Sequence, residues 1–164
     1  GKRAFPGLHF QINLLRPKST GSVRLKNSNP NEDLQINPNW FSDLSDMDDL
    51  IEGMKHMREV LSKPSLNNIV SEELLPGKDV KSTEDMKESV RNHVQTGHHP
   101  ASTCAMGSDN NKLAVLDEKL RVKGIKNLRV VDASSFPDMI SGNINASVIM
   151  LAEKAADMIL ENIN

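Results

Sequence analysis

The residues best suited to chemistry form a short run at positions 98–100, where His98 and His99 precede Pro100. Histidine titrates near neutral pH, so either ring is a plausible general base. Proline disfavours helical backbone in the residue before it, which predicts an extended conformation for His99. Because a loop histidine is more often a surface or structural residue, this run alone does not separate catalysis from structure.

A second candidate is Cys104, the one cysteine of the chain. A catalytic cysteine needs a neighbouring base and a lowered thiol pKa, and His98 and His99 are near in sequence. Cys104 lies, however, in a run of small and apolar residues that ends at Met106. A lone buried cysteine behaves as a small hydrophobic residue, so we favour a packing role over a thiol mechanism.

A third candidate is the segment SGNINA at residues 141–146, which precedes a predicted helix. Gly142 permits close approach of the backbone, and the Asn143 side chain both donates and accepts hydrogen bonds. At a helix start, such a loop is suited to bind an anion or the electron-rich edge of a ring. An ordinary N-cap at Asn145 explains the same residues equally well.

The other histidines do not indicate a metal site. They are scattered along the chain, at His9, His56 and His93. The first falls on the polar face of a predicted strand, and the other two fall on predicted helices. With one cysteine and no regular ligand spacing, we expect no metal centre.

Composition argues against two further classes of partner. The 164 residues carry 20 Lys and Arg against 22 Asp and Glu, a net charge of −2, without a basic block. We therefore expect no nucleic-acid binding through a basic face. The most apolar stretch, residues 148–156, is interrupted by Glu153 and Lys154, so it predicts a buried helix and no transmembrane segment.

The elements that must position these candidates begin with a sheet and helices. Apolar and polar residues alternate over 8–14 and again over 22–26, which predicts an antiparallel pair of strands joined by a turn. Residues 27–39, rich in Asn and Pro, predict a loop. Helical spacing of apolar residues predicts two helices, over 44–62 with Ser45 as N-cap and from about Ser82 onward.

The last part of the chain has a different pattern. Short strands are predicted at 115–117, 120–122 and 128–132, followed by a loop over 136–142. A final helix is predicted from about Asn145 to Ile163. This order of strand, loop and helix often presents backbone N–H groups to a ligand at the start of the helix.

Five motifs in a fixed order connect this chain with a known family. They are LLRPKS at 14–19 followed by GSVRL at 21–25, HPASTCAMG at 99–107, NLRVVDAS at 127–134, SGNINA at 141–146 and MLAEKAADMI at 150–159. In these motifs the sequence resembles the glucose–methanol–choline (GMC) family of FAD-dependent alcohol oxidases and dehydrogenases. Two positions depart from it, since Ser102 stands where many members have Gly and Ser147 where many have Pro.

The resemblance implies catalytic roles for two residues and a substrate-binding role for a third. His99 matches the histidine that accepts the proton of the substrate hydroxyl while hydride leaves carbon for flavin N5. Asn143 matches the second active-site position, His or Asn in the family, which hydrogen-bonds the substrate oxygen. His98 matches a position beside the substrate. The implied substrate is a small-molecule alcohol.

The resemblance also implies a set of FAD contacts. Asp132 and Ala133 match the segment that passes the diphosphate and ribityl chain of the cofactor. Asn143, Ile144 and Asn145 match the loop that meets the flavin ring, with the final helix directed at its pyrimidine end.

An α+β fold in two parts follows from the resemblance. Residues 1–115 correspond to part of a substrate-binding lobe, an antiparallel sheet with packed helices. Residues 116–164 correspond to a strand, loop and helix that complete an FAD-binding domain. The chain starts at Gly1 and contains no G-x-G-x-x-G motif, so we expect it to be an excerpt that needs an N-terminal FAD-binding region and is inactive alone.

Two other functions stay open at this stage. One is a family member without redox turnover, such as a cyanohydrin lyase, which keeps FAD without reducing it. The other is a non-catalytic fragment derived from such an enzyme. The pair of His99 and Asn143 favours redox chemistry over the lyase, and absence of an upstream FAD domain in the source gene would favour the fragment.

Overall fold

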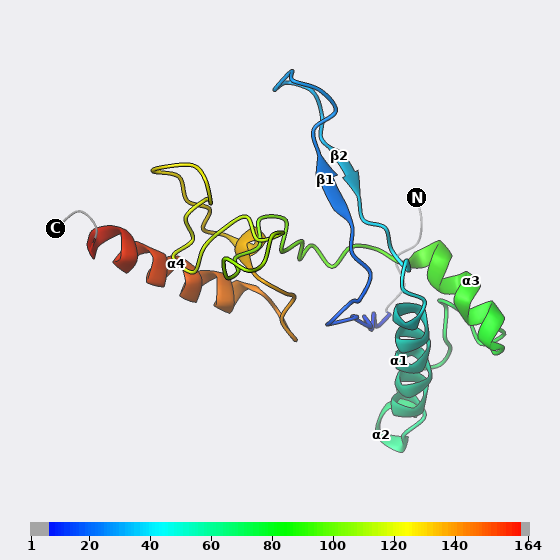
Figure 1. Cartoon of the computed structure of the whole chain (residues 1–164). Helices are drawn as coiled ribbons and strands as arrows, with labels where there is room; N and C mark the ends of the chain where they lie inside the picture. The colour runs from blue at the N-terminus through cyan, green and yellow to red at the C-terminus, as the bar shows by residue number, and fades with distance from the viewer. Residues whose placement is uncertain (1–6, 162–164) are drawn as a thin grey trace. The chain divides into compact units, whose positions relative to one another are not determined.

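A computed structural model describes residues 7–161 of the chain, and Figure 1 shows its elements. In chain order they are β1 (Ser22–Arg24), β2 (Gln35–Asn37), α1 (Ser45–Leu61), α2 (Pro64–Asn67), α3 (Thr83–His93), the short 3-10 helix η1 (Ala133–Ser135) and α4 (Asn145–Glu161). The fold therefore mixes helices with a small antiparallel sheet, in line with the expected α+β class.

The described residues divide into two compact units. The first unit contains residues 7–14 and 43–95, and the second contains 15–42 and 96–161. All the candidate site residues from His98 to Asn145 belong to the second unit.

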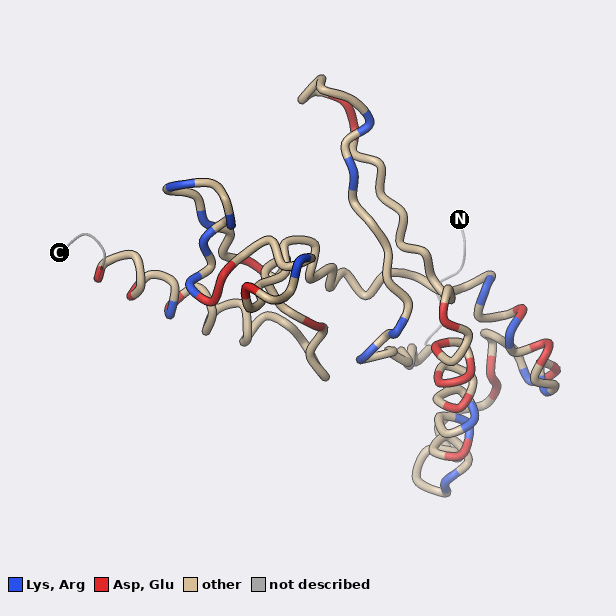
Figure 2. The backbone as a smooth tube through the Cα atoms, in the orientation of Figure 1, with Lys and Arg blue, Asp and Glu red and all other residues tan. Residues whose placement is uncertain are grey.

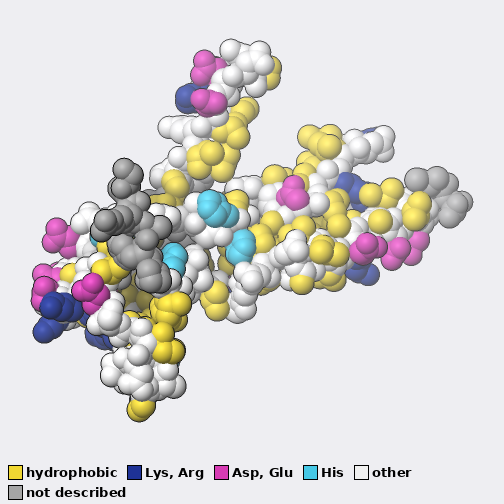
Figure 3. Space-filling model, turned by 180° about the vertical axis from the view of Figure 1, so that it is seen from behind, with side chains coloured by type: hydrophobic (Ala, Val, Ile, Leu, Met, Phe, Trp, Pro, Cys, Tyr) yellow, Lys and Arg dark blue, Asp and Glu magenta, His cyan; other side chains and the backbone are white. Residues whose placement is uncertain are grey.

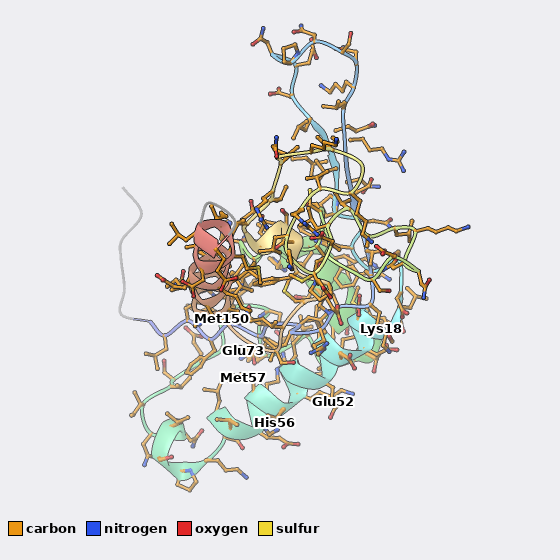
Figure 4. The ribbon with its side chains drawn as sticks, turned by 60° about the vertical axis from the view of Figure 1, so that its left-hand side comes forward. Lys18, Glu52, His56, Met57, Glu73 and Met150 are labelled. Carbon is orange, nitrogen blue, oxygen red and sulfur yellow. The ribbon has the colours of Figure 1, made fainter. Side chains whose placement is uncertain are left out.

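The first unit is built around α1, which packs against α2 and α3. Met47 and Ile51, one helical turn apart, are both 3% exposed, and Met86 of α3 is 4% exposed. Because residues four apart share one face of a helix, these side chains form the inner side of the helix packing. Glu52 and His56 share another face of α1 and are exposed, as Figure 4 shows.

The two long helices of this unit confirm the sequence prediction, with one correction at a cap. Ser82 caps α3 as expected, because its Oγ accepts from the N–H of Asp85 at 3.1 Å. Ser45 does not cap α1, which starts at that residue. Ser45 is a donor instead of the expected acceptor: its N–H and its hydroxyl donate to the Asp43 carboxylate, at 2.9 and 2.7 Å.

Residues 8–14 do not form the expected strand. Within the described chain, the sheet has two strands, and β1 pairs antiparallel with β2 in the register Ser22 to Asn37. Of the alternating apolar residues, Ile12 packs on a helix instead: its Cγ2 lies 2.7 Å from the position that a Cβ on Gly53 of α1 would take. Leu8 and Phe10 are 63% and 40% exposed. Residues 27–39, expected to be loop throughout, contain β2.

The hairpin of β1 and β2 has a clear local basis. A Cβ on Gly21 would clash with the carbonyl oxygen of Asn37, so only glycine allows the strands to approach this closely. In the connection, the N–H of Asn29 donates to the side chain of Asn27 at 2.8 Å, a turn that Asn favours. Val23 and Ile36, paired across the hairpin, remain 45% and 66% exposed, and Figure 3 shows yellow side chains along the hairpin.

The end of the chain folds through single bridges where short strands were expected. Met106 bridges Leu116, Leu116 bridges Val122, and Arg121 bridges Arg129. Leu116, Leu120 and Ala155 of α4 form a buried cluster, and six half-buried residues pack against it: Cys104, Met106, Val122, Val130, Val131 and Leu151. Cys104 thus packs against the core of the second unit, as expected.

Figure 2 shows acidic residues dominating the first turns of α1 and charges of both signs elsewhere along the described chain. No helix in that part is long and apolar enough to cross a membrane. The helix expected to reach Ile163 is α4, which is described to Glu161. Its expected last residues lie outside the described range.

Candidate functional site

A ladder of backbone hydrogen bonds brings two of the predicted site segments together. The N–H groups of Ser102, Cys104 and Met106 donate to the carbonyls of Ala133, Ser134 and Ser135, at 3.2, 2.8 and 2.9 Å respectively. The segment that follows His99 therefore runs beside the segment that follows Asp132. The core cluster around Leu116 supports this ladder from the side of Cys104 and Met106.

The two histidines stand at the start of this ladder. His98 is exposed and has left-handed backbone (φ 59°), and its N–H donates to Thr96 Oγ1 at 3.0 Å. His99 is half-buried. Neither imidazole takes part in a hydrogen bond or ion pair with the described residues. Both rings are thus available to a ligand, and His99 is the more sheltered of the two.

The carboxylate of Asp132 serves the local turn. One of its oxygens, Oδ1, accepts from the Ser134 N–H at 2.7 Å and from the Ser134 hydroxyl. The Asp132 carbonyl accepts from the N–H and the hydroxyl of the buried Ser135, at 3.0 and 2.6 Å. Asp132 therefore orders η1. Neither Asp132 Oδ2 nor the Ala133 N–H takes part in a hydrogen bond with the described residues.

The loop before α4 is open at the predicted cofactor contacts. Gly142 has empty space within 4 Å of its Cβ position, Asn143 is exposed, and Ile144 is half-buried. The Ile144 carbonyl accepts from the N–H of Val148 at 2.9 Å, and Asn145 is the first residue of α4, not its cap. The first turn of α4 contains no acidic residue, so its N–H groups favour negative charge nearby.

An arginine that sequence reasoning left without a role holds this loop. Arg16 Nη2 lies 2.9 Å from Asp138 Oδ2, and Nη1 lies 3.3 Å from Ser141 Oγ. Arg16 falls in the turn that the sequence predicted between residues 14 and 22. The signal was present in the motif at 14–19, which contains Arg16, but no local pattern links it to residues so far along the chain.

A shallow hollow of about 370 Å³ lies next to this contact. Its lining is mostly apolar and comes from Arg16, Met106, residues 136–140 of the loop, and Ser147, Met150 and Leu151 of α4. Figure 4 shows Met150 on its helix. The described residues contain no group of three His, Cys, Asp or Glu side chains placed to hold a metal ion.

The structure thus links some of the predicted site residues and leaves others separate. Ser102 and Ala133 join the histidine segment to the Asp132 segment. No hydrogen bond among the described residues joins His99 to Asn143.

Comparison with known proteins gives one consistent group. Residues 17–152 match the family model described as GMC oxidoreductase. The chain is 40% identical over 164 residues to an oxygen-dependent choline dehydrogenase of Photobacterium profundum, covering 99% of this chain and 29% of that protein. It is 37% identical over 166 residues to an alcohol dehydrogenase [acceptor] of Pseudomonas putida, covering 100% of this chain and 30% of that protein.

Solved structures agree with the sequence comparison. An FAD-dependent oxidoreductase from Chaetomium thermophilum superposes with a TM-score of 0.84 at 27% identity, over 90% of this chain and 26% of that one. The chain therefore spans less than a third of the length of these similar proteins.

Proposed function

Because this chain belongs to the GMC oxidoreductase family, we propose that it supplies the C-terminal part of an FAD-dependent alcohol oxidoreductase. The expected family is confirmed by the match over residues 17–152. The observation that carries the proposal is the ladder from Ser102 to Ala133, which places the His99 segment beside the Asp132 segment.

The described residues fit the family cofactor in two places. Near Ala133, an open backbone N–H and the free Oδ2 of Asp132 are suited to the polar chain of FAD. Near Gly142, the space around the backbone leaves room for a flat ring at the start of α4. The helix start favours the negative charge of a reduced flavin. When bound, FAD supplies the redox chemistry by accepting a hydride at N5.

The residues of this chain have distinct roles in the proposed reaction. His99 takes the proton of the substrate hydroxyl at a ring nitrogen, because its imidazole has no partner among the described residues. Asn143 orients the substrate oxygen with its exposed amide. His98 lines the substrate side, where its exposed ring is accessible. Ile144 and Asn145 hold the turn from Asn143 into α4.

The N-terminal FAD-binding region belongs to this proposal as well. The chain covers 29% of the choline dehydrogenase that it resembles, so most of the cofactor site lies in sequence outside residues 1–164. We assign residues 1–115 to the substrate lobe and 116–164 to the FAD-binding domain. Residues 1–164 alone are expected to bind FAD weakly or not at all and to have no catalytic activity.

The test uses the full gene product that contains this chain. We expect absorption bands of oxidised FAD, which bleach anaerobically when an alcohol such as choline is added. Retained flavin without bleaching, together with cleavage of a cyanohydrin, would identify a lyase. A full product without flavin would refute the enzyme proposal. Removal of residues 116–164 from the full protein is the control, and it is expected to abolish flavin binding.

A further inference from the structure

We propose that Arg16 is a positioning residue for the active site, acting on Asn143 through Asp138 and Ser141. The inference rests on the proposed function, since it takes Asn143 as the residue that orients the substrate oxygen. Arg16 itself forms no hydrogen bond with His99 or Asn143.

Two contacts of one guanidinium bracket the loop before Asn143. Nη2 donates to Asp138 Oδ2 at 2.9 Å, and Nη1 donates to Ser141 Oγ at 3.3 Å. The planar guanidinium has a fixed angle between its donors, so the two contacts fix both the distance and the orientation of the loop ends. A lysine in this place would hold one of the two contacts.

The loop between the two contacts is ordered by its own short bonds. Asp138 Oδ1 accepts from the Met139 N–H at 2.8 Å, and the Ile140 carbonyl accepts from the Gly142 N–H at 3.1 Å. Asp138 thus uses one oxygen inside the loop and the other on Arg16. Displacement of Arg16 would release the loop as a unit. Asn143 would move with it, because it directly follows Gly142, whose N–H makes the last hydrogen bond of the loop.

Burial determines what kind of role this contact has. The side chains of Arg16 and Asp138 are 58% and 72% exposed in this chain, and exposed ion pairs add little to the stability of a domain. A loop with few buried side chains opens at low cost, however, so the same contact changes the fraction of time in which the loop is closed. We therefore expect loss of Arg16 to affect catalysis far more than folding.

The experiment compares three variants of the full FAD-loaded protein. Arg16→Met removes both contacts, Arg16→Lys retains one, and Arg24→Met is the control, because Arg24 lies on β1 of the same unit and makes no contact with the loop. Hydrogen exchange of the peptide covering residues 138–144 is measured first. We expect exchange about 5-fold faster or more in Arg16→Met, a smaller change in Arg16→Lys and none in Arg24→Met.

The catalytic readout is the rate of flavin reduction per bound flavin. Arg16→Met is expected to lower this rate between about 10-fold and 100-fold, the cost of a misplaced orienting group, with the FAD content unchanged. The pH profile should keep the midpoint of the wild type, because the proton acceptor is untouched. A merely structural role would instead lower FAD content or melting temperature and leave the rate per flavin intact.

Two outcomes would overturn the proposal. One is unchanged exchange over 138–144 in Arg16→Met. The other is faster exchange with an unchanged reduction rate. Asp138→Asn combined with Arg16→Met should be no worse than Arg16→Met alone, because both remove the same contact. If none of the alcohols tested reduces the flavin of the wild-type protein, the proposed function fails. The hydrogen-exchange measurement still tests whether Arg16 holds the loop.

Discussion

The N–H of Ser102 donates to the carbonyl of Ala133 at 3.2 Å, although Ser102 has left-handed backbone with φ at 68°. This bond starts the ladder that joins the histidine segment to the segment after Asp132. Cys104 continues it and packs against the core around Leu116. The segment that follows His99 is thus held by backbone contacts on a packed support. A rigid support of this kind is what the proposed role of His99 as a base requires.

The first prediction concerns His99. Replacing it in the full protein by His99→Gln is expected to slow anaerobic flavin reduction about 100-fold or more, the usual contribution of a general base. The control is His93→Gln, since His93 Nδ1 lies 2.8 Å from the Ser89 carbonyl on α3 and has no proposed role. Stopped-flow absorbance measures both variants. A rate for His99→Gln equal to that of the wild type would remove this residue from the mechanism.

The second prediction concerns Ser102. An L-residue in left-handed backbone costs about 1–2 kcal/mol, and glycine adopts it freely, though glycine loses more chain entropy on folding. Ser102→Gly is therefore expected to stabilise the full protein by about 0.5–1 kcal/mol in urea unfolding. Ser108→Gly is the matched control, because Ser108 is exposed and has no positive φ. Ser108→Gly should be neutral or destabilising. Stabilisation by both changes would show that the gain does not come from the left-handed backbone at Ser102.

Much of the helical structure was predictable, because its causes are local. The cap at Ser82 and the apolar spacing of α1 lie within a few residues of the helices they specify. The hairpin was not predictable from alternation, since residues 8–14 alternate as well as 22–26. The choice of partner depends on contact between Gly21 and Asn37, which are far apart in sequence, and on packing of Ile12 against α1.

The candidate site shows the same division. The residue types at 98–99 and 141–145 indicated their possible chemistry, and the motif order indicated the family, which the match over 17–152 confirms. The sequence did not predict that the Asp132 carboxylate caps η1, because η1 has three residues and is too short to show a helical spacing of apolar residues. Arg16 was missed because its partners are close to it only in the folded chain.

The third prediction concerns Arg58 in the first unit. Its guanidinium donates to both oxygens of Glu73, at 3.0 and 2.8 Å, and to the carbonyls of Val80 and Gly77, at 2.7 and 3.3 Å. The Arg58 and Glu73 side chains are 26% and 24% exposed. Arg58→Met is expected to lower the free energy of unfolding by about 1.5–3 kcal/mol, because it leaves a half-buried carboxylate without its partner.

Lys55→Met is the control for Arg58, on the same helix. Lys55 Nζ lies 3.8 Å from Glu52 Oε2, and the two side chains are 47% and 77% exposed. Such a pair contributes about 0.5 kcal/mol or less. Urea unfolding of both variants tests the difference. Equal losses would show that the Arg58 contacts with Glu73 and the two carbonyls add no more stability than the exposed pair of Lys55 and Glu52.

The fourth prediction is a pH dependence at Asp117. Burial raises the pKa of this carboxyl, but hydrogen bonds from the Arg121 side chain and from the N–H groups of Arg121 and Lys119 together lower it below 3.8. The folded state thus favours the ionised form, so the stability that Asp117 adds is present above about pH 4 and is lost as the pH falls through the lowered pKa. Asp117→Asn should therefore be destabilised most near neutral pH, and its difference in stability from the wild type should shrink toward pH 2.

The control is Glu118→Gln, which changes an exposed neighbour, and its difference in stability from the wild type should not vary with pH. Thermal unfolding at several pH values measures both gaps, and a gap at Asp117 as wide at pH 2 as at pH 7 would show that its ionisation is not linked to folding.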